Sequence, residues 1–140
     1  MRYWDSSAIV PLLVQEPDTA KREAQLREDA VIATWWATRV ECASALNRLV
    51  RGGELTEEGF KLALTNLDEL AASWIEVEPS DRVRSRAMRL LRFHPLRAAD
   101  ALQLSACIAA ADEDPDSMSF VCADPRLCTA ADKEGFAVLA

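Results

Sequence analysis

The sequence predicts an α/β domain in which a mostly parallel sheet has helices on both faces. Five short β-prone runs are separated by segments with helical periodicity, and this alternation is typical of parallel sheets. The chain has 140 residues, half of them apolar and 28% charged, with only 4 glycines and 6 prolines. This length and composition predict one domain, residues 1–140, with short connections.

The chain begins with a short strand, residues 2–4. An apolar helix follows, capped by Ser6 or Ser7, and it stops before a Glu-Pro pair. With a serine as the cap, we expect Asp5 to stand free at the end of the strand. Residues 18–29 are polar and helical, and we expect solvent on most of this helix.

The next segment comprises a strand, two helices and a strand. Residues 30–33 are β-prone, and Thr34 can cap a helix that ends at two successive glycines. A second helix covers residues 55–72, and residues 74–77 alternate like a strand before a proline. Residues 34–72 are therefore predicted to form a helical hairpin inserted between two strands.

The remaining segment again alternates helices with strands. Residues 81–93 form an arginine-rich helix, and a His-Pro pair separates it from a helix at residues 96–111 that is rich in small apolar side chains. Residues 119–123 form a continuous apolar strand. A last helix, residues 127–134, closes at a glycine and leads into the final strand, residues 136–139.

Charge is unevenly distributed along the chain. The formal net charge of −7 by itself counts against a polyanionic partner, but the stretch from Arg82 to Arg97 holds six arginines and no acid. Within it, Arg82, Arg86 and Arg89 share one helical face. This face is interpreted either as a solvated surface or as a rim that binds phosphates beside the site, and the second interpretation predicts salt-dependent binding.

Two features predict a cytoplasmic location. The four cysteines form no CxxC pair and lie in apolar runs, which is typical of small buried thiols in a reducing compartment. Asp5 interrupts the only N-terminal apolar stretch, so no signal peptide is visible. No apolar run approaches the roughly 20 residues that a membrane span needs, so we expect no membrane association.

Two aspartates directly follow expected strands. Asp5 comes after the first strand and Asp124 after the fourth. In open parallel sheets, ligands bind beyond the carboxyl ends of the strands. Each aspartate also has an ordinary alternative, because aspartate often caps a helix or forms a turn at such a junction.

Two further acids lie on apolar helix faces. Glu41 aligns with alanine and leucine side chains, where an ionised glutamate is costly unless it has a partner. Asp100 lies at the start of an otherwise apolar helix. There the helix dipole, or Arg97 three residues earlier, can also account for the acid.

Together these acids predict a cation site at one edge of the sheet. Two carboxylates about 4 Å apart repel each other by roughly 4 kcal/mol at an effective dielectric constant near 20. A cation shared between the acids relieves this repulsion. An all-oxygen ligand set favours Mg²⁺ or Mn²⁺ over zinc, and such ions support the hydrolysis of phosphodiesters.

Four stretches of the chain resemble the signature segments of PIN-domain ribonucleases: WDSSAIVPLLVQEP, TRVECASAL, HPLRAADALQLSA and FVCADPRLCTAADKEGFAV. More narrowly, the chain is similar to VapC-type toxins of type II toxin–antitoxin systems. The likeness covers essentially the whole chain. It implies a PIN-like three-layer sandwich, in which a parallel sheet of four to five strands lies between helical layers and carries a helical hairpin insertion.

The resemblance also implies the roles of individual residues. It assigns metal binding and catalysis to Asp5, Glu41, Asp100 and Asp124, with Mg²⁺ or Mn²⁺ as the cofactor. Ser7 matches a small hydroxyl position and is expected to orient Asp5. Arg97 is expected to pair with an acid or with phosphate.

The implied activity is endonucleolytic cleavage of single-stranded RNA regions by metal-activated water, which leaves 5′-phosphate and 3′-hydroxyl ends. The implied partners are RNA, a cognate VapB-type antitoxin whose C-terminal segment occupies the site, and a second copy of the chain in a homodimer. On this basis the face formed by Arg82, Arg86 and Arg89 is a candidate RNA contact. Two alternatives stay open: a PIN-domain nuclease of RNA processing outside any toxin pair, and a non-catalytic binding module of the same fold.

Overall fold

The computed structural model describes residues 1–140 and contains one five-stranded sheet in which every pairing is parallel. The strands are β1 (Arg2–Trp4), β2 (Ile32–Trp35), β3 (Ile75–Val77), β4 (Ser119–Val121) and β5 (Ala137–Leu139). Their order is β3-β2-β1-β4-β5, so β1 is central and the direction of strand succession reverses between β1 and β4. Open parallel sheets bind ligands beyond the carboxyl ends of the strands at such a reversal.

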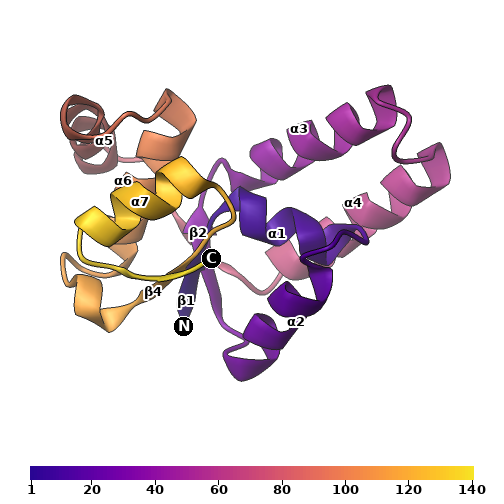
Figure 1. Cartoon of the computed structure of the whole chain (residues 1–140), viewed down its shortest axis with the longest axis horizontal. Coiled ribbons are helices and arrows are strands. Elements are labelled where there is room, and N and C mark those ends of the chain that lie inside the picture. Colours follow the sequence, from indigo (N-terminus) through magenta and orange to yellow (C-terminus); the bar gives the residue numbers. More distant parts are fainter.

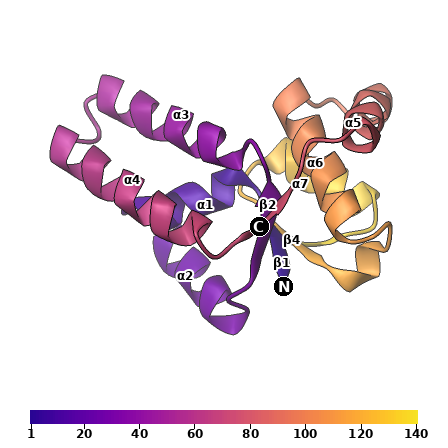
Figure 2. The same cartoon turned by 180° about the vertical axis from the view of Figure 1, so that it is seen from behind.

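Helices cover both faces of the sheet (Figure 1 and Figure 2). One face carries α1 (Ser6–Leu13), α2 (Thr19–Glu28), α3 (Thr38–Arg51) and α4 (Glu57–Ala71). The other carries α5 (Asp81–Phe93), α6 (Ala98–Ala110) and α7 (Pro125–Lys133). A short 3₁₀ turn at Pro115–Ser117 precedes β4. The predicted parallel sheet between two helical layers is confirmed.

The central strand divides the core into two clusters. Tyr3 and Trp4 are both fully buried and point to opposite faces, because successive strand residues alternate. Tyr3 belongs to the cluster under α5, α6 and α7, and Trp4 to the cluster under α1, α3 and α4. The four cysteines are free thiols, and three of them are buried, as predicted. Because β1 is covered on both faces, the residue that follows it, Asp5, begins inside the protein.

Helices α3 and α4 form the hairpin that the sequence predicted between two strands (Figure 1). Helix α3 ends at Gly52, and Gly53 has a φ of +75°, a left-handed conformation that glycine adopts at little cost. The hydroxyl of Thr56 caps α4 by accepting the backbone N–H of Gly59 at 3.0 Å. Local sequence signals therefore suffice to define both inner ends of this hairpin.

The structure corrects two expected helix caps. Asp5, and not one of the serines after it, caps α1, since its Oδ2 accepts the backbone N–H of Ser7 at 3.0 Å. Thr34 lies inside β2, because its hydroxyl donates to the Trp4 carbonyl of the neighbouring strand at 2.7 Å. Helix α3 therefore begins only at Thr38, and β2 lies two residues later than expected.

Most of helix α2 is exposed or half-buried, as expected, but Arg22 is fully buried. The Arg22 guanidinium donates to the carbonyl of Cys122 at 3.3 Å and to that of Leu139 at 3.2 Å. These carbonyls lie at the carboxyl ends of β4 and β5. Arg22 thus fastens α2 to the strand end from which the chain continues to Asp124.

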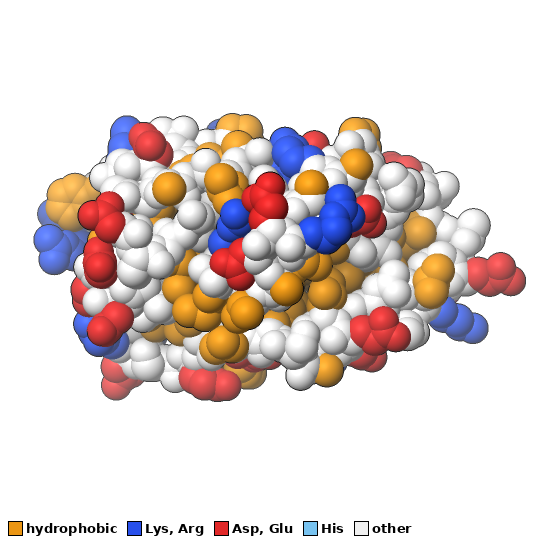
Figure 3. All heavy atoms as spheres, turned by 90° about the horizontal axis from the view of Figure 1, so that it is seen from below, with side chains coloured by type: hydrophobic (Ala, Val, Ile, Leu, Met, Phe, Trp, Pro, Cys, Tyr) orange, Lys and Arg blue, Asp and Glu red, His pale blue; other side chains and the backbone are white.

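The surface carries both kinds of charge. Viewed from below the orientation of Figure 1, acidic and basic side chains are mixed among exposed hydrophobic ones, so this side presents no extended basic surface (Figure 3). No helix combines the length and the apolar character required to cross a membrane.

Candidate active site

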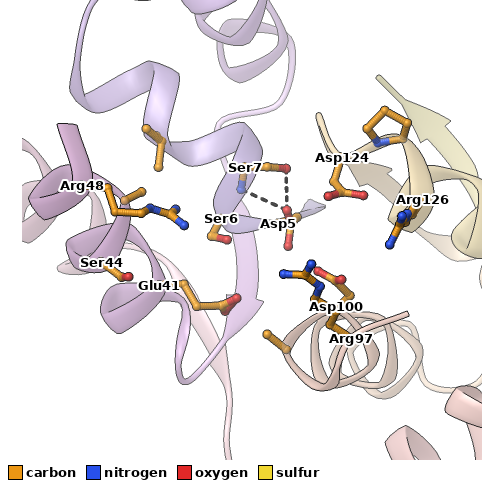
Figure 4. A pocket seen from close by; sticks show the side chains of 14 residues that line it. Asp5, Ser6, Ser7, Glu41, Ser44, Arg48, Arg97, Asp100, Asp124 and Arg126 are labelled. Atoms are coloured by element: carbon orange, nitrogen blue, oxygen red, sulfur yellow. Dashed lines mark hydrogen bonds between the residues drawn. The ribbon is translucent and has the colours of Figure 1, made fainter. Parts of the chain in front are cut away.

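Four acidic side chains line one pocket of about 700 Å³ (Figure 4). Asp5 comes from the β1–α1 junction, Glu41 from the first turn of α3, Asp100 from the first turn of α6 and Asp124 from the β4–α7 junction. They lie at the edge of the sheet where the strand order reverses. The structure therefore brings together all four acids that the sequence singled out.

Asp5 is only 4% exposed and is held by several hydrogen bonds. Its backbone N–H donates to the carbonyl of Val121 at 2.9 Å, which joins the ends of β1 and β4. Its Oδ2 accepts from the backbone N–H of Ser7 at 3.0 Å and from the Ser7 hydroxyl at 2.5 Å. Its Oδ1 accepts no hydrogen bond from the protein. Asp5 thus caps α1 with one oxygen and leaves the other for a ligand.

Ser7 connects the ends of the two central strands. Its hydroxyl donates to Asp5 and accepts the backbone N–H of Ala123 at 3.0 Å. The sulfur of Cys122 lies 3.7 Å from the same hydroxyl. The expected contact between Ser7 and Asp5 is therefore present, and it extends to the segment that carries Asp124.

Asp124 caps α7 much as Asp5 caps α1. Its Oδ1 accepts the backbone N–H of Leu127 at 3.0 Å, and Pro125 occupies the first helical position, where no N–H is needed. Its own N–H donates to the sulfur of Cys122 at 3.3 Å. Both strand-end aspartates therefore combine a helix cap with one carboxylate oxygen that binds no protein donor.

Glu41 is held by a buried glutamine on the opposite helical layer. Gln103 donates from Nε2 to Oε2 of Glu41 at 2.7 Å and to the hydroxyl of Thr38 at 3.0 Å. Its Oε1 accepts the hydroxyl of Tyr3 at 2.7 Å. Gln103, Tyr3 and Thr38 are all fully buried. This network fixes the orientation of the Gln103 amide and presents an N–H to Glu41.

The pKa of Glu41 is raised to about 7, chiefly because burial disfavours the charged carboxylate. The hydrogen bond from Gln103 opposes this effect, and the charges of Asp5 and Asp100 add to it. Near neutral pH the Glu41 carboxyl is therefore protonated about as often as it is ionised. A nearby cation favours the ionised form.

Burial is also the main cause that raises the pKa of Asp5 and that of Asp100. The charge of Asp124 raises the pKa of both carboxyls. Hydrogen bonds from Ser7 lower the pKa of Asp5, and Arg97 lowers that of Asp100. The charges of neighbouring acids therefore add to the rise in the pKa of Asp5, Glu41 and Asp100.

The donor set fits a divalent cation that prefers oxygen. All four acids are carboxylates, and Asp5 and Asp124 each have an oxygen free of protein hydrogen bonds. Such ligands suit Mg²⁺ and Mn²⁺. No three acidic, histidine or cysteine side chains are already gathered as a complete ligand set. The four carboxylates of the pocket therefore fit a divalent cation by the chemistry of their oxygen donors and by their negative charge.

Three arginines join the acids in the pocket. Arg48, Arg97 and Arg126 are exposed, and none lies within 4.0 Å of an acidic oxygen. Figure 4 shows Arg97 and Arg126 beside Asp100, whose pKa both arginines lower. The sequence singled out Arg97 alone of these three. The pocket therefore offers positive charge next to its carboxylates.

The arginine face of α5 lies elsewhere. Arg82 and Arg86 both pair with Glu113, beyond the C-terminal end of α6, at 2.6 Å in the case of Arg82. Asp100 lies in the first turn of the same helix, about 15 Å along its axis from the C-terminal end. Of the two interpretations of this face, the phosphate-binding rim beside the acids is therefore wrong for Arg82 and Arg86, because the acidic loop after α6 holds both. Their contact with RNA stays a prediction.

Sequence reasoning also missed residues that surround the acids: Ser6, Ser44, Arg48, Gln103 and Arg126. Two of them carried a visible signal. Gln103 is a polar residue in a mostly apolar run, three residues after Asp100, and Arg126 follows Asp124 by two residues. The other three are ordinary helix residues, and only the packing of α1 against α3 places them at the pocket.

Comparison with known proteins places these residues in a family context. The family model described as PIN domain matches residues 2–132. Two relatives from Mycobacterium tuberculosis are named ribonuclease VapC45 (strain CDC 1551 / Oshkosh) and ribonuclease VapC49 (strain ATCC 25618 / H37Rv). Each is 32% identical over 111 residues, which is 79% of this chain and 76% of the relative.

Two solved structures share the fold. PAE2754 from Pyrobaculum aerophilum superposes with a TM-score of 0.67 at 19% identity, over 99% of this chain and 89% of that one. FitAcB from Neisseria gonorrhoeae superposes with a TM-score of 0.64 at 18% identity, over 100% of this chain and 97% of that one. At these identities the likeness concerns the fold.

Proposed function

Since this chain belongs to the PIN-domain family, we propose that it is a VapC-type endoribonuclease, a hydrolase that cleaves single-stranded regions of RNA and acts as the toxin of a type II toxin–antitoxin pair. The observation that carries this proposal is the meeting of Asp5, Glu41, Asp100 and Asp124 in one pocket. Two relatives named ribonuclease VapC support RNA as the substrate.

The proposed reaction depends on Mg²⁺ or Mn²⁺. Asp5, Asp100 and Asp124 are the proposed ligands, and Glu41 binds directly or orients a water molecule. When bound, such an ion lowers the pKa of a water molecule and offsets the charge that develops on the phosphodiester. The raised pKa of Glu41 supports this assignment, because binding of a cation to the pocket would cause the Glu41 carboxyl to release its proton.

The other residues of the pocket orient the acids and bind the substrate. Ser7 fixes one oxygen of Asp5, and Gln103 fixes one oxygen of Glu41, so neither carboxylate has to be ordered during the reaction. Arg97 and Arg126 lie beside Asp100 and offer N–H groups to phosphate oxygens. The pocket thus combines acids for a cation with arginines for an anionic substrate.

The proposal extends to the partners and the setting of the enzyme. We expect residues 1–140 to act as one PIN-like domain, in the cytoplasm, as a homodimer. A cognate VapB-type antitoxin is the expected inhibitor, with its C-terminal segment in the pocket. An antitoxin-like reading frame directly upstream would support the toxin role over a role in RNA processing.

Cleavage of RNA by the purified chain tests the proposal. Total cellular RNA is incubated with the protein in Mg²⁺, in Mn²⁺ and in EDTA, and the new ends are mapped. We expect cuts in single-stranded regions that require the metal, bear 5′-phosphates and disappear with Asp100→Asn. Asp116→Asn, at an exposed acid outside the pocket, is the matched control. The absence of metal-dependent cuts, or full activity of Asp100→Asn, would show that the proposal is wrong.

A further inference from the structure

The pocket continues past the acids between α1 and α3. Ser6 and Val10 of α1 form one wall of this extension, and Ser44, Ala45 and Arg48 of α3 form the other. Beyond Glu41 no acid lines it. We refer to these five residues as the α1–α3 arm.

Arg48 lies on the same face of α3 as Glu41. The two residues are seven positions apart, with Ser44 between them, and this spacing returns to one side of a helix every two turns. The rise of an α-helix places their backbones about 10 Å apart along the axis. In Figure 4 the Arg48 guanidinium points from α3 towards Ser6, across the arm. Its charged group is therefore directed into the pocket.

No acid engages Arg48. On the same helix, Arg39 pairs with Asp68 at 2.6 Å, whereas Arg48 has no acidic oxygen within 4.0 Å. Arg97 and Arg126, at the other end of the pocket, offset the charge of Asp100. Arg48 is thus a pocket arginine that no acid engages, on the side of Glu41 away from Asp100.

We propose that Arg48, with the hydroxyl of Ser44, forms a subsite for a backbone phosphate of the RNA, one to three nucleotides from the bond that is cut. This inference rests on the proposed ribonuclease function. A guanidinium binds phosphate through paired N–H groups, and the exposed hydroxyl of Ser44 lies one turn away on the same face. Successive phosphates of a stacked strand are about 3.4 Å apart along its axis, so the 10 Å offset spans up to about three nucleotides.

In this arrangement the RNA strand crosses the four acids and continues along the α1–α3 arm. Arg97 and Arg126 then lie on one side of the scissile phosphate, and Arg48 lies on the other. Arg48 binds the backbone and no base, so it contributes to affinity for every sequence alike. Each phosphate contact with a single strand adds about 0.7 to the slope of log K against log salt concentration. Loss of Arg48 is therefore expected to lower that slope by about this amount.

The direct test is RNA binding without cleavage. An Asp100→Asn background with Mg²⁺ holds the RNA uncut, and fluorescence anisotropy of a labelled single strand is measured across a salt series. Adding Arg48→Ala is expected to weaken binding about 5- to 10-fold and to lower the salt slope by about 0.7. Arg51→Ala is the matched control, since Arg51 is exposed on the same helix, unpaired and outside the pocket. Arg48→Lys is expected to keep the slope and to recover only part of the affinity.

Cleavage by the otherwise native enzyme gives a second, independent measurement. Arg48→Ala is expected to raise KM on long single strands and to leave kcat nearly unchanged. In a series of substrates shortened from each end, this difference should vanish at one end once the strand no longer reaches the arm. Unfolding in urea checks that the variant is folded.

Different results would contradict the Arg48 subsite and the ribonuclease function. If the native enzyme cuts RNA but Arg48→Ala and Arg51→Ala bind it with the same affinity and salt slope, the subsite is wrong and the ribonuclease stands. If the native enzyme cuts no RNA with either metal, the proposed function is wrong, and the subsite falls with it.

Discussion

The amide of Gln103 donates a hydrogen bond of 2.7 Å to Oε2 of Glu41 and thereby connects helices on opposite faces of the sheet. Tyr3 donates to the oxygen of the same amide at 2.7 Å, so the amide cannot turn over without losing both contacts. An acid of the pocket is therefore positioned by a fully buried side chain from the layer across the sheet.

Replacement of Gln103 by leucine should destabilise the protein. The change leaves the buried hydroxyl of Tyr3 without its acceptor, and an unsatisfied buried group costs about 1–3 kcal/mol. Urea unfolding in EDTA measures the difference, with Gln15→Leu, at an exposed glutamine, as the control. Equal free energies of unfolding for Gln103→Leu and the native protein would contradict the role of this network.

Loss of the Ser7 hydroxyl should weaken metal binding. Ser7→Ala removes the donor to Asp5 and the acceptor of the Ala123 N–H, while the backbone cap from Ser7 to Asp5 remains. Loss of such an outer partner typically lowers metal affinity about 10- to 100-fold. Calorimetric titration with Mn²⁺ measures this change. Ser85→Ala, on the exposed side of α5, should bind Mn²⁺ like the native protein, and an equal affinity for Ser7→Ala would count against the orienting role.

The raised pKa of Glu41 makes the stability of the metal-free protein depend on pH. The folded protein holds this proton up to about pH 7, whereas an unshifted glutamate releases it near 4.5. The stabilisation from the bound proton is complete below pH 4.5 and is lost as the pH rises through 7. As the pH rises from 4.5 to 7, the free energy of unfolding of Glu41→Gln should therefore increase relative to that of the native protein. Above pH 7 the difference between the two proteins should stay constant.

Urea unfolding in EDTA at pH 5, 6, 7 and 8 tests this dependence. Asp5 and Asp100, whose pKa values are also raised, are present in both proteins, so the comparison reports Glu41 together with its coupling to these two acids. A difference in the free energy of unfolding that is the same at every pH would contradict the assigned shift.

Addition of Mg²⁺ should stabilise the native protein. A ligand that binds only the folded state adds about 2.7 kcal/mol when its concentration is one hundred times Kd. Asp5→Asn should lose most of this gain, because it removes a charge from the centre of the acidic group. Thermal unfolding with and without Mg²⁺ measures the effect. Asp116→Asn should retain the gain, and a full gain in Asp5→Asn would exclude Asp5 as a ligand.

The amino-acid sequence by itself determined the order of the elements and the four acids. Strand and helix periodicity, the double glycine after α3 and the capping threonine before α4 act over a few residues, so they are visible along the chain. The acids were predictable for the same local reason, since two follow strands and two interrupt apolar helix faces. Their places at strand ends and helix starts predicted one shared cation site, and the family resemblance then implied their roles.

Only the tertiary structure decided which partner each polar group takes. Asp5 takes the cap predicted for a serine because its carboxylate reaches the N–H of Ser7, and Arg82 and Arg86 turn to Glu113 instead of the pocket. Glu41 and Gln103 are 62 residues apart, and Tyr3 and Gln103 are 100 apart. Contacts over such separations depend on how the two helical layers meet at the edge of the sheet, and no local pattern in the chain encodes that packing.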